Sequence, residues 1–302
     1  MSHTNFFVGS RQLQIQDEEN GLSYPVLVQY PTYTAATPTS FGPYVMEVSV
    51  DADIAEGKFP LVIISHGNGG SHLLYRTISM HLVRNGYIAA MLEHYGNNRN
   101  NNTLENTALN LQYRPRHVSM TIEQLLTESW LQDFVAQDKI AVIGHSMGGY
   151  TALAVAGGIP WLKEGEKIDV TSNPRVKAIV LLAPGTGWFR DSLSKVTIPI
   201  LMFMAEHDPV TPAWNAEVVL TSIPDASQVI HKVVENAGHF SFLSPFPETM
   251  RRPDFRPSTD PPGFDRDAFH KELPVEVLAF LEDTLNRTPN EKNKTDNKIV
   301  SK

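Results

Sequence analysis

The stretch from Lys139 to Gly158, KIAVIGHSMGGYTALAVAGG, restricts the possible folds of this chain more than any other. A short apolar run, Ile140–Ile143, leads into GHSMG at 144–148, and an alanine-rich segment follows. This pattern predicts a buried strand, a sharp turn and a helix, which together present a serine at the end of the strand. A serine on so tight a turn is strained, and the glycines two positions to either side leave room for the strand and the helix. A structural serine in a glycine-rich loop is the alternative, so the rest of the sequence has to decide.

Other short runs have the length of strands buried in a parallel sheet, and helical patterns separate several of them. They lie at residues 59–65, 87–92, 176–183, 198–204 and 228–234. This alternation predicts an α/β fold with one doubly wound, mostly parallel sheet and helices on both faces. We expect a single domain over residues 1–287, followed by a polar tail, 288–302, that is disordered.

The segments between these runs carry weaker signals. Residues 5–30 read as a β-hairpin, because two stretches with alternating apolar residues flank a turn. Helices are expected to begin near Pro115 and Pro274, since proline favours the first helical turn. The asparagine-rich run at 97–102 is expected to be a solvated loop, and the proline-rich residues 244–272 an irregular excursion.

The composition excludes several classes of function. The chain has no cysteine, so disulfides, thiolate metal sites and a cysteine nucleophile are impossible. Its net charge of −8, with no dense cluster of Lys and Arg, argues against nucleic acid as a partner. No apolar run approaches the roughly 20 residues of a transmembrane helix, and the N-terminus lacks the pattern of a secretory signal. A cytoplasmic setting is therefore expected, while the oligomeric state stays open.

Two further side chains complete a possible catalytic triad with Ser146. A serine hydroxyl needs a positioned base, and that base needs a carboxylate to fix its tautomer. Asp208 directly follows the run at 198–204, and His239 follows the run at 228–234 behind a glycine. A turn-capping role is the ordinary alternative for Asp208, and most single histidines are structural or surface residues. Glu206 and, more weakly, Asp191 compete with Asp208 for the role of the acid.

Two main-chain N–H groups are predicted to form an oxyanion hole. Met147 follows the serine, and Asn68 lies in HGNGG, the loop after the run at 59–65. A phosphate-binding loop is the alternative for HGNGG, but neither of the usual glycine patterns is present. His66 and His145 are expected to pack or hydrogen bond, because no further ligand has metal-ligand spacing with them. We expect no metal and no organic cofactor.

Several longer motifs resemble a known superfamily. Over about residues 10–287 the chain looks like an α/β-hydrolase, and more narrowly like the platelet-activating-factor acetylhydrolase-like group and the bacterial proteins often called predicted dienelactone hydrolases. The motifs that carry the resemblance are SHGNGGSHLLYRTISMHLVRNGYIAAMLEHYG, IGHSMGG, NAGHFSFL and DPPGFDRDAFHKEL.

The resemblance implies that Ser146, Asp208 and His239 cleave ester bonds through an acyl-enzyme. This sequence differs from the family patterns in two respects, which limit what the resemblance implies. True dienelactone hydrolases use a cysteine nucleophile, which this chain lacks. Animal phospholipid acetylhydrolases place the acid one strand earlier, where this sequence has Leu182-Ala183-Pro184, so Asp208 follows the bacterial pattern.

These features together predict a serine hydrolase acting on a small-molecule carboxylic ester, thioester or lactone. Two alternatives use the same scaffold. One is an acyltransferase or cyclase in a biosynthetic pathway, in which an alcohol or amine replaces water. The other is a binding protein without catalytic activity. The aromatic residues Trp188, Phe189, Trp214 and Phe240–Phe242 are expected in the core, although together they could form the walls of an apolar pocket.

Overall fold

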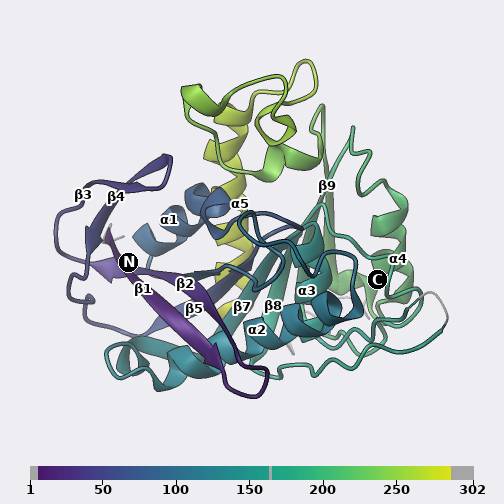
Figure 1. The fold of residues 1–302 in the computed structure, drawn as a ribbon, viewed down its shortest axis with the longest axis horizontal. Coiled ribbons are helices and arrows are strands. Elements are labelled where there is room, and N and C mark those ends of the chain that lie inside the picture. The colour runs from purple at the N-terminus through teal and green to yellow at the C-terminus, as the bar shows by residue number, and fades with distance from the viewer. Residues whose placement is uncertain (1–5, 163–164, 287–302) are drawn as a thin grey trace, which may run out of the picture.

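The short apolar runs form the middle of one sheet, as predicted. A computed structural model describes residues 6–162 and 165–286 (Figure 1). Its sheet has ten strands in the order β10-β9-β8-β7-β5-β6-β2-β1-β4-β3. The strands from β6 to β10 across this order are mutually parallel. The ten strands are β1 (Phe7–Asp17), β2 (Leu22–Thr32), β3 (Thr37–Phe41), β4 (Tyr44–Val50), β5 (Phe59–Ser65), β6 (Ile88–Leu92), β7 (Val135–His145), β8 (Val176–Leu182), β9 (Ile200–Ala205) and β10 (Val229–Val234).

The first two strands extend this sheet with antiparallel pairing. β1 and β2 form the predicted hairpin, in which Phe7 pairs with Thr32 and Asp17 with Leu22. β2 then runs antiparallel to β6, which joins the hairpin to the parallel strands. The predicted tail, residues 288–302, lies outside the described residues.

Helices cover both faces of the sheet, which explains why the central strands are apolar throughout. The side chains of α1 and α5 pack in one hydrophobic cluster, and those of α2, α3 and α4 pack in a second one on the opposite face. Among the described residues, the α-helices are α1 (Arg76–Arg84), α2 (Ala108–Thr127), α3 (Met147–Val155), α4 (Trp214–Ser222) and α5 (Arg266–Leu285). Every residue of β5 is buried between these layers. Within the described ranges, no helix has the length and apolar character that crossing a membrane requires.

The expected start of α2 at Pro115 is wrong. The helix begins at Ala108, where the side chain of Thr107 accepts a hydrogen bond from the N–H of Asn110 at 3.1 Å. Pro115 lies in the helix interior and has no N–H to donate to the carbonyl of Leu111. The hydroxyl of Tyr150 donates to that carbonyl instead, at 2.9 Å, and this replacement partner makes the interior proline tolerable.

The expected start of α5 at Pro274 is also wrong. The helix begins at Arg266, inside the segment 244–272 that was expected to be irregular, and Asp265 caps it by accepting from the N–H of Ala268. Short 3₁₀ turns occupy part of the segment before α5. This segment is drawn above α1 in Figure 1. In both helices the start is therefore set by a capping residue, Thr107 or Asp265, and not by the proline farther along the chain.

The asparagine-rich run is not simply a solvated loop. Asn97 is fully buried, whereas Asn100 is exposed. The buried amide hydrogen bonds to several neighbours, because a polar group without solvent needs partners inside the protein. One end of this loop therefore belongs to the interior beside the carboxyl ends of the strands.

Candidate active site

Ser146 lies on the sharp turn between β7 and α3. Its backbone is in a strained region, with φ 56° and ψ −117°. A Cβ atom on Gly144 would lie 2.0 Å from the carbonyl oxygen of Gly148, and a Cβ atom on Gly148 would lie 2.0 Å from that of Ser65. Both positions therefore exclude any side chain, and the two glycines allow the turn to present Ser146 at the edge of the sheet.

We predict that Gly148→Ala lowers the free energy of unfolding by about 3 kcal/mol, because the new methyl group meets backbone that cannot move without separating α3 from β5. Gly185→Ala is the matched control, since its Cβ would lie 3.5 Å from Trp188, an ordinary contact. Urea unfolding measures both variants. Equal stabilities would contradict the packing argument.

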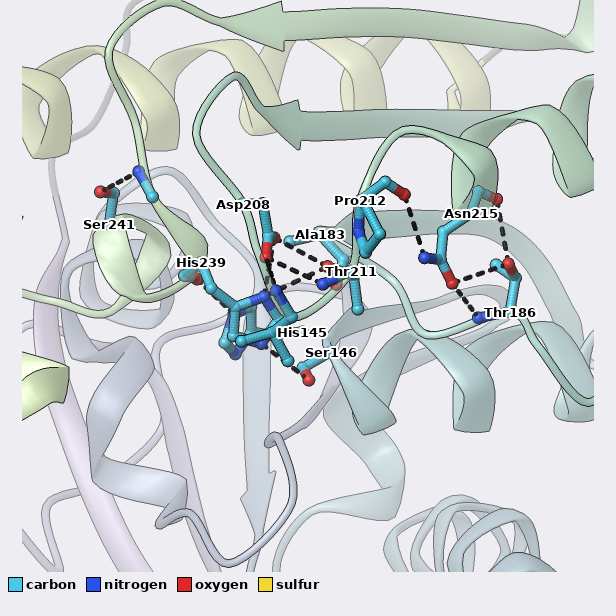
Figure 2. Close-up of polar contacts among 12 residues, drawn as sticks. His145, Ser146, Ala183, Thr186, Asp208, Thr211, Pro212, Asn215, His239 and Ser241 are labelled. Atoms are coloured by element: carbon cyan, nitrogen blue, oxygen red, sulfur yellow. Dashed lines mark hydrogen bonds and ion pairs between the residues drawn. The ribbon is translucent and has the colours of Figure 1, made fainter. Parts of the chain in front are cut away.

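The structure brings the three predicted side chains together in one row (Figure 2). Nε2 of His239 lies 2.9 Å from Oγ of Ser146, and Nδ1 of His239 lies 2.8 Å from Oδ2 of Asp208. The His239 and Asp208 side chains are 4% and 1% exposed, whereas Ser146 is only partly buried. With Nδ1–H donating to the carboxylate, Nε2 is free to accept the serine proton.

The carboxylate of Asp208 is fixed on both oxygens. Oδ1 accepts from the N–H groups of Val210 and Thr211 at 2.7 and 2.8 Å, and Oδ2 accepts from the Thr211 hydroxyl at 2.8 Å. Burial acts to raise the pKa of Asp208, but the hydrogen bonds from His239 and Thr211 outweigh it and hold the pKa below its ordinary value. Thr211 was not singled out in the sequence, although its place three residues after Asp208 fits a side chain that closes the turn.

The competing acids lie elsewhere. Glu206 is exposed and accepts from the N–H of Asn236 at 2.8 Å, and Asp191 is exposed on a loop. Among the described residues, the side-chain partners of His239 Nδ1 are Asp208 and Thr211, and neither Glu206 nor Asp191. Asp208 is therefore the carboxylate that could orient this histidine.

His145 connects three parts of the site. Its Nε2–H donates to the carbonyl of His239 at 2.9 Å, and its Nδ1 accepts from the Tyr75 hydroxyl at 3.0 Å. The same hydroxyl accepts from the N–H of Gly67 at 3.2 Å. Burial, together with the nearby His239, lowers the pKa of His145 to about 3, so this ring stays neutral and keeps both bonds. The expected hydrogen-bonding role of His145 is confirmed, but its partner Tyr75 was not predicted from the sequence.

The two predicted oxyanion donors are the main-chain N–H groups of Met147 and Asn68. Met147 is the first residue of α3, and Asn68 lies in the loop after β5, so both N–H groups are close to strand ends. Neither N–H donates a hydrogen bond to another described residue, so both are available to a substrate oxygen. The peptide that carries the Asn68 N–H is held through its carbonyl, because Gly67 O accepts from His66 Nδ1–H at 2.7 Å and from Gly70 N–H at 3.1 Å. Its orientation is therefore set before any substrate binds.

A cavity of about 610 Å³ opens beside Met147. Leu111, Trp161 and Trp188 are among the residues that line it. Of the aromatic residues considered in the sequence, Trp188 lines this cavity, whereas Phe189 is fully buried and stacks on Tyr150. A larger groove of about 880 Å³ elsewhere contains none of the predicted site residues. Across residues 6–162 and 165–286, no group of three or more His, Asp or Glu side chains is placed to hold a metal ion.

Buried histidines predict that acid destabilises the fold. Burial lowers the pKa of His117 and of His145 to about 3, and that of His270 to about 4. It also holds the pKa values of His66 and His94 well below the ordinary range. Below about pH 6.5 the unfolded chain takes up protons that the folded chain refuses, so the free energy of unfolding falls as the pH falls. Each such histidine contributes up to about 1.4 kcal/mol per pH unit.

Urea unfolding between pH 7.5 and pH 5 checks this expectation. If only two of these histidines stay neutral in the folded protein, the free energy of unfolding should fall by about 3 kcal/mol for each pH unit below 6.5. A midpoint that does not change over this range would contradict the neutral state of these rings.

Comparisons with known proteins agree with this architecture. The model of a family described as "alpha/beta hydrolase fold" matches residues 60–196. Among solved structures, a ferulic acid esterase from Streptomyces cinnamoneus superposes with a TM-score of 0.69 at 17% identity, covering 95% of this chain and 93% of that one. The α/β-hydrolase fold predicted from the sequence is thus confirmed.

Curated relatives match this chain over only part of its length. Cutinase est1 of Thermobifida alba is 24% identical over 60% of this chain and 53% of its own length. A bis(hydroxyethyl) terephthalate hydrolase of Streptomyces coelicolor is 24% identical over 62% of this chain and 52% of its own. Platelet-activating factor acetylhydrolase of Canis lupus familiaris is 25% identical over 45% of this chain and 40% of its own length. The matched region spans about half the length of the first two relatives.

The parallel sheet, the serine turn between β7 and α3 and these matches lead to one conclusion. The chain has the α/β-hydrolase fold, and its residues 60–196 match the family model of that description.

Proposed function

We propose that this protein hydrolyses small-molecule carboxylic esters through an acyl-enzyme formed on Ser146. The observation that carries the proposal is the continuous row of hydrogen bonds from Ser146 through His239 to Asp208, at 2.9 and 2.8 Å. The names of the relatives support it, since cutinases, a terephthalate ester hydrolase and an acetylhydrolase are all ester-cleaving enzymes.

The proposed reaction uses each side chain in turn. Oγ of Ser146 attacks the ester carbonyl carbon while Nε2 of His239 takes the hydroxyl proton. The carbonyl oxygen becomes negatively charged and accepts hydrogen bonds from the N–H groups of Met147 and Asn68. The C–O bond to the alcohol breaks, and His239 returns the proton to the departing oxygen. Asp208 stabilises the positive charge that His239 carries between these steps.

Water completes the cycle. It attacks the acyl carbon as His239 takes one of its protons. The bond to Oγ then breaks, His239 returns that proton to Oγ, and the carboxylic acid leaves with Ser146 restored. Thioesters and lactones present the same carbonyl to the serine, and for a lactone both products remain in one molecule.

A panel of p-nitrophenyl esters graded by acyl length tests the proposal. We expect turnover of at least one member, with one acid formed for each nitrophenol released. Adding a competing alcohol or amine separates hydrolysis from acyl transfer, because an acyltransferase would form the new ester or amide in preference to the acid. Absence of turnover above the rate of Ser146→Ala across the whole panel would overturn the proposed activity.

A further inference from the structure

A buried cation lies behind the predicted oxyanion loop. Arg114 on α2 is fully buried, and the partners of its guanidinium are neutral oxygen atoms. Nε donates to Oγ1 of Thr151 at 3.0 Å, Nη1 donates to Oδ1 of Asn97 at 2.6 Å, and Nη2 donates to Oγ of Ser65 at 3.3 Å and to the carbonyl of His66. Burial lowers the pKa of Arg114 to about 9, which leaves it charged at neutral pH. Burying a cation without a carboxylate opposes folding, and such local conflicts are concentrated at functional sites.

From Arg114 the hydrogen bonds continue into a closed ring of side chains. The amide of Asn97 accepts from Arg114, so its NH₂ group must face the other way. That group donates to Oδ1 of Asn68 at 2.6 Å and to Oδ1 of Asn102 at 2.7 Å. Glu105 closes the ring, because its carboxylate accepts from the side-chain NH₂ groups of both Asn68 and Asn102.

This ring fixes a residue that would otherwise be loose. Asn68 is exposed at the tip of a short loop, yet both polar atoms of its side chain are bound. Its main-chain N–H is the predicted oxyanion donor, and a misplacement of such a donor by about 1 Å reduces catalysis on the order of 10²-fold. The carbonyl of His66, which Arg114 holds, lies two residues before Asn68, so the loop is held from its buried side as well.

We propose that Arg114 and Asn97 are positioning residues for the oxyanion, which hold Asn68 so that its main-chain N–H meets the charge that develops on the substrate oxygen. The inference rests on the proposed function and extends it to the asparagine-rich loop. Neither residue touches the substrate in this account. Both act through Asn68, and their loss should appear in kcat more than in KM.

Asn97→Asp is the variant that separates positioning from folding. An aspartate keeps the oxygen that accepts from Arg114 and pairs with the buried cation, but it has no NH₂ group to donate to Asn68 and Asn102. We expect the thermal midpoint to stay level or rise, while kcat falls about 10- to 100-fold with KM within roughly threefold. Asn100→Asp makes the same chemical change at an exposed position of the same loop and should leave both constants unchanged.

A second variant opens the ring from the surface. Glu105 is exposed, so Glu105→Ala removes the acceptor for Asn68 without disturbing the core. We expect kcat to fall roughly three- to tenfold. If Asn97→Asp does not fold, this variant alone tests whether the ring positions Asn68. The proposal is overturned if kcat stays within about twofold of the parent in every variant that folds, or if Asn100→Asp loses as much as Asn97→Asp.

The rate of Ser146 phosphonylation by a fluorophosphonate gives a readout that does not depend on ester turnover. If the parent reacts with the probe but hydrolyses no ester, the proposed activity fails, and the ratio of variant to parent labelling rates still tests the positioning. If the parent turns over esters and the Asn97 and Glu105 variants match it in both assays, only the positioning fails. A parent that does neither overturns both.

Discussion

Ser146→Ala is expected to reduce kcat/KM for an activated ester by about 10⁴- to 10⁶-fold while leaving the fold intact. The hydroxyl is the atom that forms the acyl-enzyme, and no other group in the row from Asp208 to His239 can replace it. Its loss removes a single oxygen from a partly buried position, so the thermal midpoint should change by only a few degrees. Steady-state kinetics and thermal unfolding of the same preparation provide the two measurements.

Ser40→Ala is the control for this variant, because Ser40 is exposed on β3, at the opposite edge of the sheet from β10. It should keep the full activity. If Ser146→Ala retained substantial turnover, the nucleophile would be another group, and the proposed mechanism would be wrong.

Asp208→Asn is expected to have the next largest effect, a fall of about 10³- to 10⁴-fold in kcat. The reason lies in the hydrogen bonds around the carboxylate. Two main-chain N–H groups, from Val210 and Thr211, require an acceptor at Oδ1, so the oxygen of an asparagine must occupy that place. The NH₂ group then faces Nδ1 of His239 and forces the proton to Nε2, where it blocks acceptance of the Ser146 proton.

Glu206→Gln makes the same change at the nearby acid that the sequence left as an alternative. Glu206 contacts the N–H of Asn236, so this variant should keep its kcat. The two variants together identify the acid: a large loss in Glu206→Gln with little loss in Asp208→Asn would contradict the assignment. KM should change little in Asp208→Asn, because the carboxylate lies behind the histidine and away from the substrate.

Much of the fold could be predicted because its signals are local. The apolar runs at 59–65 and 176–183 became β5 and β8, and GHSMG at 144–148 became the turn between β7 and α3. The doubly wound sheet follows from the alternation of such runs with helices. A single domain and a cytoplasmic setting stay predictions.

The features that the sequence did not reveal depend on contacts between distant residues. Pro115 was expected to start a helix, because nothing near it in the chain indicates that Tyr150 supplies the missing hydrogen bond. Asn97 was expected in solvent, because asparagine is usually exposed and its buried partner, Arg114, lies on a different element. Tyr75 meets His145 across 70 residues of sequence, and no pattern in one chain encodes that pairing.

We propose that Ser146 is a nucleophile activated by His239 and Asp208. Reaction with a fluorophosphonate tests it most directly, because the serine oxygen displaces fluoride from phosphorus and leaves a stable adduct. Peptide mass mapping of the treated, folded protein locates that adduct. We expect one phosphonyl group, on the peptide that contains Ser146, with greatly slowed labelling in Asp208→Asn and none in Ser146→Ala. An unmodified parent protein, or an adduct on a different residue, would contradict it.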